Sequence, residues 1–189
     1  MDTPPPDFRT ARLLLTPLQL ADAPAIQQVF PQWNIVRYLA DIVPWPYPDD
    51  GALTYVRDVA LPAMRAGRQW HWTLRPLGQP QRLIGMISLM NDNEENQRGF
   101  WLDPQWQGRG LMTEACGPVT DFWFDTLRQP VLRIAKAADN LASRRISVQS
   151  GMRVVARGMR HYVCGALPSE TWEITREAWQ ARRREGIAP

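Results

Sequence analysis

The stretch LDPQWQGRGLMTEA, residues 102–115, places two glycines around one arginine, between an apolar strand-like run and an apolar helix-like run. Glycine allows the backbone to approach a ligand closely, and the first turn of a helix leaves N–H groups free to bind an anion. The pattern therefore predicts a turn that opens a helix and can hold an anion. The identity of that anion decides the chemistry.

Two common phosphate-binding motifs do not fit this turn. A Walker A loop requires G-x-x-x-x-G-K-[ST], which does not occur, and a dinucleotide fingerprint requires a third glycine where Thr113 stands. The pattern that fits is Gln-x-x-Gly-x-Gly, from Gln105 to Gly110. Successive N–H groups in such a loop can surround a diphosphate, and Arg109 adds positive charge. Taken alone, the two glycines would fit a plain left-handed turn without a ligand equally well.

Composition predicts one globular domain over residues 1–189, with residues 1–8 as a flexible N-terminal segment. The 189 residues are 44% hydrophobic and 22% charged, which is enough for a core. The N-terminus has no secretory signal pattern, and no apolar run reaches the ~20 residues that span a bilayer. Cys116 and Cys164 fit no metal or redox spacing. We therefore expect a cytoplasmic protein without a membrane segment or a bound metal.

The net charge of +3 is mild, and Lys136 is the only lysine. Arginine suits phosphate recognition because its planar fork binds two oxygens, although coding bias would also explain the count. The one basic cluster, Arg182–Arg184, fits a solvated helix end. Because no basic stripe runs along the sequence, we expect no nucleic-acid partner.

Periodicity predicts a mixed α/β chain. Alternating or apolar runs favour strands, and spacing of three and four favours helices, with Pro118 expected to kink one of them. Prolines 44, 46 and 48 favour a turn-rich loop over residues 33–50. We expect strands at 11–18, 69–75, 82–90, 98–102 and 131–137. We expect helices at 21–30, 51–66, 111–127 and 139–152. The last two segments, RVVARGMRHYV and ETWEITREAW, would form two strands, or a strand and a tail. This order fits a largely antiparallel sheet flanked by helices.

Residues 101–115 resemble the acetyl-CoA-binding motif of the GNAT N-acetyltransferase superfamily. The fuller match, W-L-x-P-x-W-Q-G-R-G-L-x-T-E-A, is similar to the ribosomal-protein alanine acetyltransferase group of RimJ/RimL type. Other segments resemble that group in the right order: TARLLLTPL, with Thr16 where an arginine is usual; RLIGMISL; and NLASRRISVQSGM, with Met152 in place of an aromatic residue. The resemblance covers roughly residues 9–180, and several linked motifs are more specific than one.

The resemblance implies a GNAT fold, with a mixed, mostly antiparallel twisted sheet that splays between the strands at 98–102 and 131–137. The pantetheine arm of acetyl-CoA would lie in the gap like an added strand. An amine would attack the thioester directly, and an N–H near Leu102 would stabilise the oxyanion. The residues that this places at the cofactor are Trp101, Leu102, Gln107, Gly108, Arg109, Gly110, Leu111, Met112, Thr113, Asn140, Ser143 and Arg144.

The resemblance also implies a proton donor. Ser143 matches the serine that this group is thought to use to protonate the departing thiolate. Many other GNAT enzymes use a tyrosine where this chain has Ser147, and this difference adds weight to Ser143. An ordinary serine on a helix surface, and for Asn140 a plain helix cap, would explain the same residues.

A base is needed because an α-amino group, with a pKa of ~8, is largely protonated at neutral pH. Glu94 and Glu95 stand where family members often place such an acid, and we assign Glu95 the catalytic role and Glu94 a place near the acceptor. Both also fit solvated loop charges, and His161 is a further option. Acceptor contacts are expected from the irregular N-terminal part, although core packing would equally explain each of Trp33, Tyr38, Trp45 and Tyr47.

We therefore expect an acetyl-CoA-dependent N-acetyltransferase whose acceptor is a primary amine, either a protein N-terminus or a small molecule. A non-catalytic acyl-CoA-binding regulatory module is the alternative; it would keep the loop from Gln105 to Gly110 but lack a working acid and base. An exposed strand or apolar tail could also support a homodimer.

Overall fold

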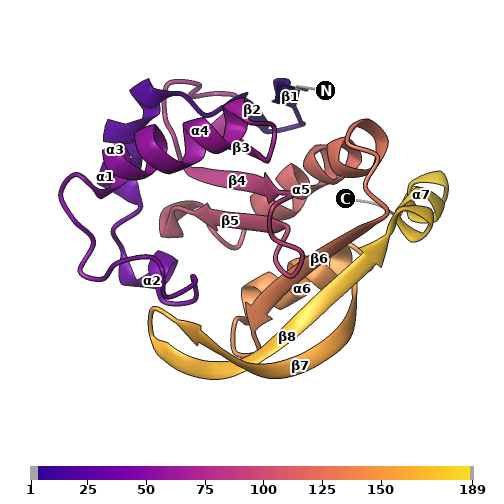
Figure 1. Cartoon of the computed structure of the whole chain (residues 1–189). Coiled ribbons are helices and arrows are strands. Elements are labelled where there is room, and N and C mark those ends of the chain that lie inside the picture. The colour runs from indigo at the N-terminus through magenta and orange to yellow at the C-terminus, as the bar shows by residue number, and fades with distance from the viewer. Residues whose placement is uncertain (1–3, 188–189) are drawn as a thin grey trace.

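The computed structural model describes residues 4–187 and shows two antiparallel sheets (Figure 1). The first sheet has the strand order β1 (Phe8–Arg9), β2 (Leu13–Pro17), β3 (Gln69–Pro76), β4 (Gly85–Met90) and β5 (Arg98–Leu102). The second has the order β6 (Val131–Ala137), β8 (Gly165–Thr175) and β7 (Arg153–Tyr162). The helices are α1 (Ala23–Val29), α2 (Trp33–Val36), α3 (Gly51–Tyr55), α4 (Leu61–Arg65), α5 (Leu111–Asp121), α6 (Leu141–Gln149) and α7 (Arg176–Arg184).

The two sheets meet at β5 and β6, each an edge strand of its own sheet. They are joined near their first residues, where the Gln97 N–H donates to the Arg133 carbonyl at 2.8 Å. The Arg133 N–H in turn donates to Gln97 Oε1 at 2.7 Å. No ladder joins β5 to β6 along the described chain, so their facing edges stay open toward Leu102 and Ala137. The splayed, mostly antiparallel sheet expected from the sequence is thereby confirmed.

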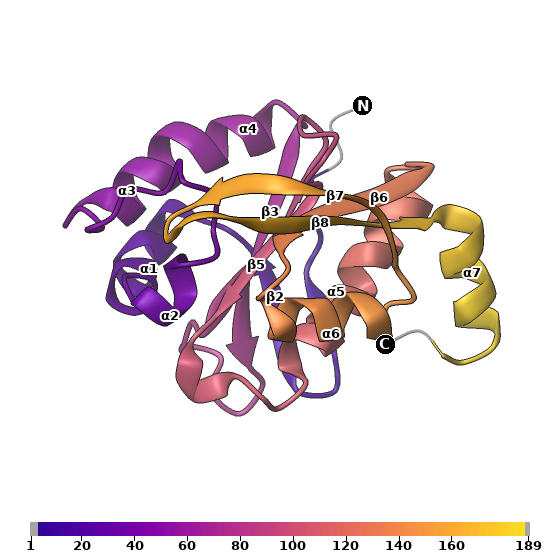
Figure 2. The ribbon, with the colours of Figure 1, turned by 90° about the horizontal axis from the view of Figure 1, so that it is seen from below.

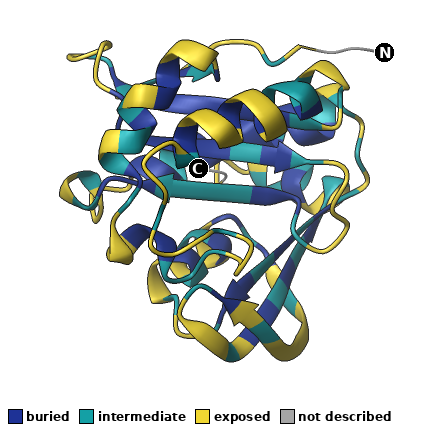
Figure 3. Cartoon of the chain, turned by 60° about the vertical axis from the view of Figure 1, so that its left-hand side comes forward, coloured by how far each residue is buried: buried dark blue, intermediate teal, exposed yellow. Residues whose placement is uncertain are grey.

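The first sheet separates two hydrophobic clusters. Alternation along β5 places Leu102 in the cluster under α5, and Trp101 against the cluster that contains α1 and α3. Figure 2 shows α5 on one side of this sheet and α1, α3 and α4 on the other. Figure 3 shows the strands of this sheet largely buried between helices whose outer faces are exposed. Residues on β5 can therefore reach either side of the sheet.

Several elements differ from the sequence expectation. The helix expected at 51–66 is interrupted by a wide π turn, Val56–Ala60, just before Pro62, and Leu53 is exposed rather than buried. The helix expected at 111–127 likewise ends at Asp121 and continues as a π turn, Phe122–Thr126, because Pro118 cannot donate a backbone hydrogen bond. The loop at 33–50 contains the short helix α2.

The last element was also mispredicted. The segment ETWEITREAW leaves the sheet at Thr175, whose side chain accepts a hydrogen bond from the Ala178 N–H at 3.2 Å. This cap starts α7, which we had not expected, and α7 carries the basic cluster Arg182–Arg184 in its last turn. The cluster thus lies at a helix end, as the sequence indicated.

Part of the N-terminal segment 1–8, which the sequence predicts to be flexible, is held against the first sheet. Residues 1–3 lie outside the described residues. The Pro6 carbonyl accepts a hydrogen bond from Trp72 Nε1 at 2.7 Å, and Phe8 pairs with Leu15 in the first sheet. In residues 4–187, no helix is long and apolar enough to cross a membrane.

Candidate active site

A cavity of about 380 Å³ lies where β5 and β6 diverge. Its walls come from the end of β5, the glycine turn, the first turn of α5, one face of α6 and the chain around α2. The lining residues are Asn34, Ile35, Arg37, Tyr38, Leu39, Phe100, Trp101, Leu102, Gln107, Gly108, Gly110, Leu111, Met112, Thr113, Asn140, Ala142, Ser143, Arg145, Ile146 and Gln149. Most of the cofactor residues expected from the sequence thus meet in one place.

The glycine turn is built by short-range contacts. Asp103 Oδ1 accepts a hydrogen bond from the Gln105 N–H at 3.0 Å and so caps the turn Pro104–Trp106. Gln107 Nε2 then donates to the Leu102 carbonyl at 2.8 Å, which ties the turn to the end of β5. Gly108 and Gly110 adopt φ angles of 73° and 75°, in the left-handed region that favours glycine. The turn therefore delivers the N-terminus of α5 to the cavity wall.

The connection between β1 and β2 supports this turn. Arg12 Nη1 donates to the Arg109 carbonyl at 2.8 Å, and Arg12 Nε donates to Glu114 at 2.7 Å. Thr10 also donates to Glu114. Burial raises the pKa of Glu114, but the hydrogen bonds from Thr10 and Arg12 outweigh it and lower that pKa overall. The Arg109 guanidinium lies over the Trp106 ring at 5.3 Å, and Arg109 does not line the cavity.

The backbone of Leu102 faces the open edge of β5. The next N–H, that of Asp103, donates to the Ile84 carbonyl at 2.7 Å, on the β4 side. Because successive residues of a strand direct their N–H groups to opposite edges, the Leu102 N–H points away from β4 and toward the gap. Gly85 allows this close approach of β4, since a Cβ there would lie 2.5 Å from the Trp101 carbonyl oxygen.

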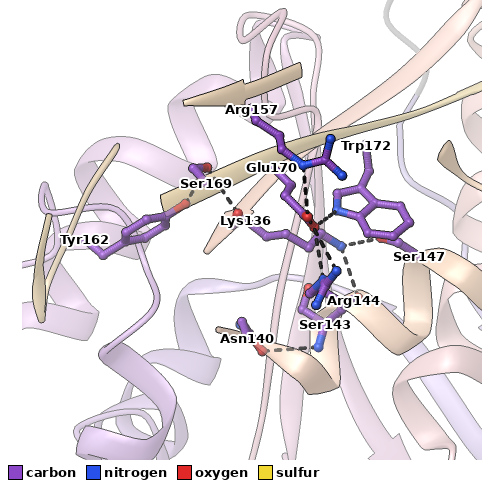
Figure 4. A network of polar contacts seen from close by, with 10 residues as sticks. All are labelled: Lys136, Asn140, Ser143, Arg144, Ser147, Arg157, Tyr162, Ser169, Glu170 and Trp172. Atoms are coloured by element: carbon purple, nitrogen blue, oxygen red, sulfur yellow. Dashed lines mark hydrogen bonds and ion pairs between the residues drawn. The ribbon is translucent and has the colours of Figure 1, made fainter. Parts of the chain in front are cut away.

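Helix α6 forms the opposite wall. Asn140 caps it, because its Oδ1 accepts a hydrogen bond from the Ser143 N–H at 3.1 Å. Lys136 reaches from β6 to donate from Nζ to the Ser143 carbonyl at 3.1 Å and to the Ser147 hydroxyl, as Figure 4 shows. Both backbone groups of Ser143 are therefore held, while its hydroxyl has no hydrogen-bond partner among the described residues.

Arg144 and Arg145 point to different sides of α6. Arg144 pairs with Glu170 at 3.0 Å, and Glu170 also accepts from Trp172 Nε1 at 3.1 Å, so Arg144 is turned toward β8 (Figure 4). Arg145 lines the cavity instead. Sequence reasoning missed Arg145, although its spacing from Ala142 and Gln149, at i, i+3 and i+7, marks one helix face.

The four aromatic residues expected at the acceptor site separate. Tyr38 lines the cavity. Trp33 and Trp45 pack on each other at 5.5 Å outside it, each 43% exposed. Tyr47 packs on Phe30 at 5.0 Å, and burial raises the pKa of Tyr47 to about 12.

The two glutamates expected near the acceptor also lie outside the cavity lining. Glu94 and Glu95 are exposed in the loop between β4 and β5, and Glu95 forms an ion pair with Arg160. Among the lining residues there is no aspartate and no glutamate. A carboxylate base would therefore have to reach the cavity through water.

The turn between β7 and β8 is hydrogen-bonded to the chain after α2, which forms part of the cavity wall. The Val163 N–H donates to the Leu39 carbonyl at 3.0 Å, and the Cys164 N–H donates to the Arg37 carbonyl at 3.1 Å. Ala40 and Tyr162 add an isolated bridge. The second sheet thus fixes the chain after α2, which lies on the side of the first sheet away from α5 (Figure 1).

Comparison with known proteins agrees with this arrangement. The family description "Acetyltransferase (GNAT) domain" matches residues 12–153, three quarters of the chain and all the elements around the cavity except β7 and β8. The chain belongs to the GNAT acetyltransferases. Solved structures of RimJ and RimL share the fold that the motifs of this chain led us to expect.

Relatives with solved structures share this fold. The ribosomal-protein-S5-alanine acetyltransferase of Vibrio fischeri superimposes with a TM-score of 0.78 at 14% identity, over 93% of this chain and 99% of that one. RimJ of Mycobacterium smegmatis, in complex with a CoA disulfide, gives 0.77 at 18% identity, over 96% and 94%. RimL, a ribosomal L7/L12 α-N-protein acetyltransferase in complex with CoA, gives 0.76 at 15% identity, over 90% and 98%.

A curated relative is similar over a shorter span. YdaF of Bacillus subtilis, named as a candidate ribosomal N-acetyltransferase, is 29% identical over 103 residues. The match covers 48% of this chain and 56% of that protein, so the chain spans about half the length of the curated relative it matches.

Proposed function

We propose that this chain transfers an acetyl group from acetyl-CoA to a primary amine by direct attack on the thioester. The observation that carries the proposal is one cavity at the open edge of β5, between the end of that strand and α6. It is lined by the glycine turn and α6 on one side of the sheet, and by residues 34–39 on the other. Donor and acceptor could therefore enter from opposite sides and meet in the gap.

Each part of acetyl-CoA can be assigned to a part of the cavity lining. The pantetheine amides would pair with the open edges of β5 and β6, as an added strand does. The diphosphate would lie against Gly108, Gly110 and the first N–H groups of α5, with Arg145 adding positive charge. Asn140 would hold the pantetheine region, and the Leu102 N–H would stabilise the oxyanion that forms on the thioester. Arg109 and Arg144 would contribute only through their neighbours, since neither lines the cavity.

Ser143 is the proposed proton donor to the departing thiolate. It is 8% exposed, lines the cavity, and has a hydroxyl that no other described residue binds. The proton from the attacking amine would leave through water, and Glu95 is the base that we assign from the sequence. Ser143 would then deliver a proton to sulfur as the carbon–sulfur bond breaks.

For the acceptor, we propose a protein N-terminus. Several relatives with this fold are named for acetylation of ribosomal proteins, and the chain after α2 forms a cavity wall that a peptide could enter. A small-molecule amine is the second candidate. Tyr38 would contact the acceptor directly, while Trp33, Trp45 and Tyr47 would shape the loop that flanks it.

Release of free CoA thiol from acetyl-CoA, measured with peptides, polyamines and aminoglycosides, tests the activity. We expect turnover with at least one amine, and mass spectrometry should find a product heavier by one acetyl group. Ser143→Ala should lower kcat by more than tenfold and change the KM for acetyl-CoA little. Ser150→Ala is the control, because Ser150 is buried at the opposite end of the same helix and outside the cavity lining, and it should keep kcat. CoA binding without turnover on any amine would instead favour a regulatory acyl-CoA-binding module.

A further inference from the structure

Every formally charged side chain in the cavity lining is positive. Its lining contains two arginines, Arg37 and Arg145, and no aspartate or glutamate. Neither arginine forms an ion pair with a described residue, whereas Arg133, Arg144 and Arg160 outside it each pair with a glutamate. The two unpaired guanidinium groups are therefore available to bind anions.

Arg37 is held in place by the fold. Its carbonyl accepts the hydrogen bond from Cys164 in the β7–β8 turn, and its guanidinium lies over the Tyr38 ring at 4.6 Å. Its Nε is buried and has no hydrogen-bond partner. No described carboxylate neutralises this guanidinium, so an anion that enters the cavity beside Arg37 would gain a charge-assisted contact.

The position of Arg37 separates it from the expected diphosphate site. Arg37 directly follows α2, whose residues Ile35 and Val36 belong to the cluster on the α1 and α3 side of the sheet. The glycine turn and Arg145 belong to the side of α5 and α6. Arg145 is thus placed for the anion of the cofactor, and Arg37 for a second anion that enters from the acceptor side.

We propose that Arg37 binds a carboxylate on the acceptor, so that the preferred substrate is a primary amine with a carboxylate nearby, such as a peptide N-terminus followed by an acidic side chain. This inference rests on the proposed function. Arginine binds a carboxylate through two parallel hydrogen bonds, which would orient the amine relative to the thioester. The two arginines also disfavour the protonated form of the amine, which raises the fraction ready to attack.

The same charges exclude polycations as good acceptors. A polyamine or an aminoglycoside would bring further ammonium groups next to Arg37 and Arg145, with no carboxylate in the lining to offset the repulsion. Recognition of such substrates requires acidic side chains, and this cavity has none.

Matched peptides test the inference. We would compare Ser-Glu, Ser-Gln and Ser-Lys N-termini on one otherwise neutral, C-terminally amidated sequence, together with free glutamate and spermidine. Binding would be followed by calorimetry on the CoA-loaded protein, and transfer by CoA release. We expect the Ser-Glu peptide to bind roughly tenfold or more tightly than Ser-Lys, and spermidine to bind weakly. Tighter binding of free glutamate than of the Ser-Glu peptide would assign the carboxylate to an amino acid rather than a peptide.

Variants distinguish the role of Arg37 from that of Arg145. Arg37→Gln should remove the preference for Ser-Glu and leave the KM for acetyl-CoA unchanged, and Arg37→Glu should shift the preference toward Ser-Lys. Arg145→Gln is the matched control, which should raise the KM for acetyl-CoA and keep the preference. Equal binding of all three peptides, or a preference for Ser-Lys or spermidine in the wild-type protein, overturns the inference. Preferential binding of Ser-Glu without acetyl transfer would support the Arg37 site and contradict the proposed enzymatic function.

Discussion

Lys136 on β6 donates from Nζ to the carbonyl oxygen of Ser143 at 3.1 Å and so joins the second sheet to the helix that carries the proposed acid. The side chain is 4% exposed, and no carboxylate within the described residues forms an ion pair with it. Burial, reinforced by the positive charge of Arg98, lowers the pKa of Lys136 to about 7. The contact that positions Ser143 thus comes with a buried charge that destabilises the fold.

This relationship predicts a pH dependence of stability. The pKa of Lys136 is about 7 in the folded chain, and an unfolded lysine has a pKa of ~10.4, so between these values the unfolded state binds more protons. The contribution of Lys136 to the free energy of unfolding should therefore rise with pH, by at most about 1.4 kcal/mol per pH unit. Urea unfolding at several pH values between 7.5 and 9.5 measures it.

Two variants isolate this contribution. Lys136→Met cannot titrate, so the difference in stability between wild type and this variant should grow in favour of the wild type as the pH rises. Arginine in Lys136→Arg stays charged over this pH range, so the free energy of unfolding of this variant should likewise lack the rise with pH. A difference that does not depend on pH would show that the pKa of Lys136 is not lowered.

Gly108→Val should weaken acetyl-CoA binding without unfolding the chain. A Cβ at Gly108 meets no atom within 4 Å, so the cost to the fold is the backbone strain at φ 73°, on the order of 1–2 kcal/mol. The added side chain would occupy the space that the diphosphate needs, and we expect the KM for acetyl-CoA to rise by more than tenfold. Gly186→Val, at φ 69° and equally open, is the strain-matched control outside the cavity. An unchanged KM in Gly108→Val would remove the glycine turn from cofactor binding.

Gly85→Ala should disturb the end of β5. The new Cβ would lie 2.5 Å from the Trp101 carbonyl oxygen and 3.2 Å from the Leu102 Cα, so β5 has to move. We expect a loss of about 1–3 kcal/mol in stability and a fall in kcat of tenfold or more, because the Leu102 N–H shifts away from the thioester. Gly78→Ala, in an open turn, should change neither. If Gly85→Ala lost stability but kept kcat, the oxyanion role of Leu102 would be refuted.

The Arg12–Glu114 ion pair should contribute to stability and also to the binding of acetyl-CoA. Replacing each residue by alanine, singly and together, gives a coupling free energy that we expect to be about 0.5–1 kcal/mol, since Arg12 is half exposed. Both single variants should also raise the KM for acetyl-CoA, because Arg12 holds the Arg109 carbonyl of the turn. The exposed Arg57–Asp58 pair is the control, with little coupling and no change in KM expected. Equal KM changes in both pairs would argue against a specific role for Arg12.

Elements with a clear local signal were predicted well. The alternation of Trp70, Trp72 and Leu74 located β3, and the apolar run at 131–137 matches β6 residue for residue. The helix at 51–66 was less regular than predicted, because Pro62 removes a hydrogen bond and the backbone widens into a π turn. The boundary between β8 and α7 was missed because the cap at Thr175 and the strand before it have similar local preferences.

The family resemblance, the glycine turn and most of the strands and helices follow from the amino-acid sequence alone, because left-handed glycines, helix caps and alternation are local properties of a few neighbouring residues. Which side chains share the cavity depends on packing between distant parts of the chain. Arg144 and Arg145 differ by one position, yet about 100° of helical rotation places only the second at the cavity. Arg37 reaches the cavity because the turn at Cys164 fixes its backbone, and that contact joins residues far apart in the chain, which no local pattern records.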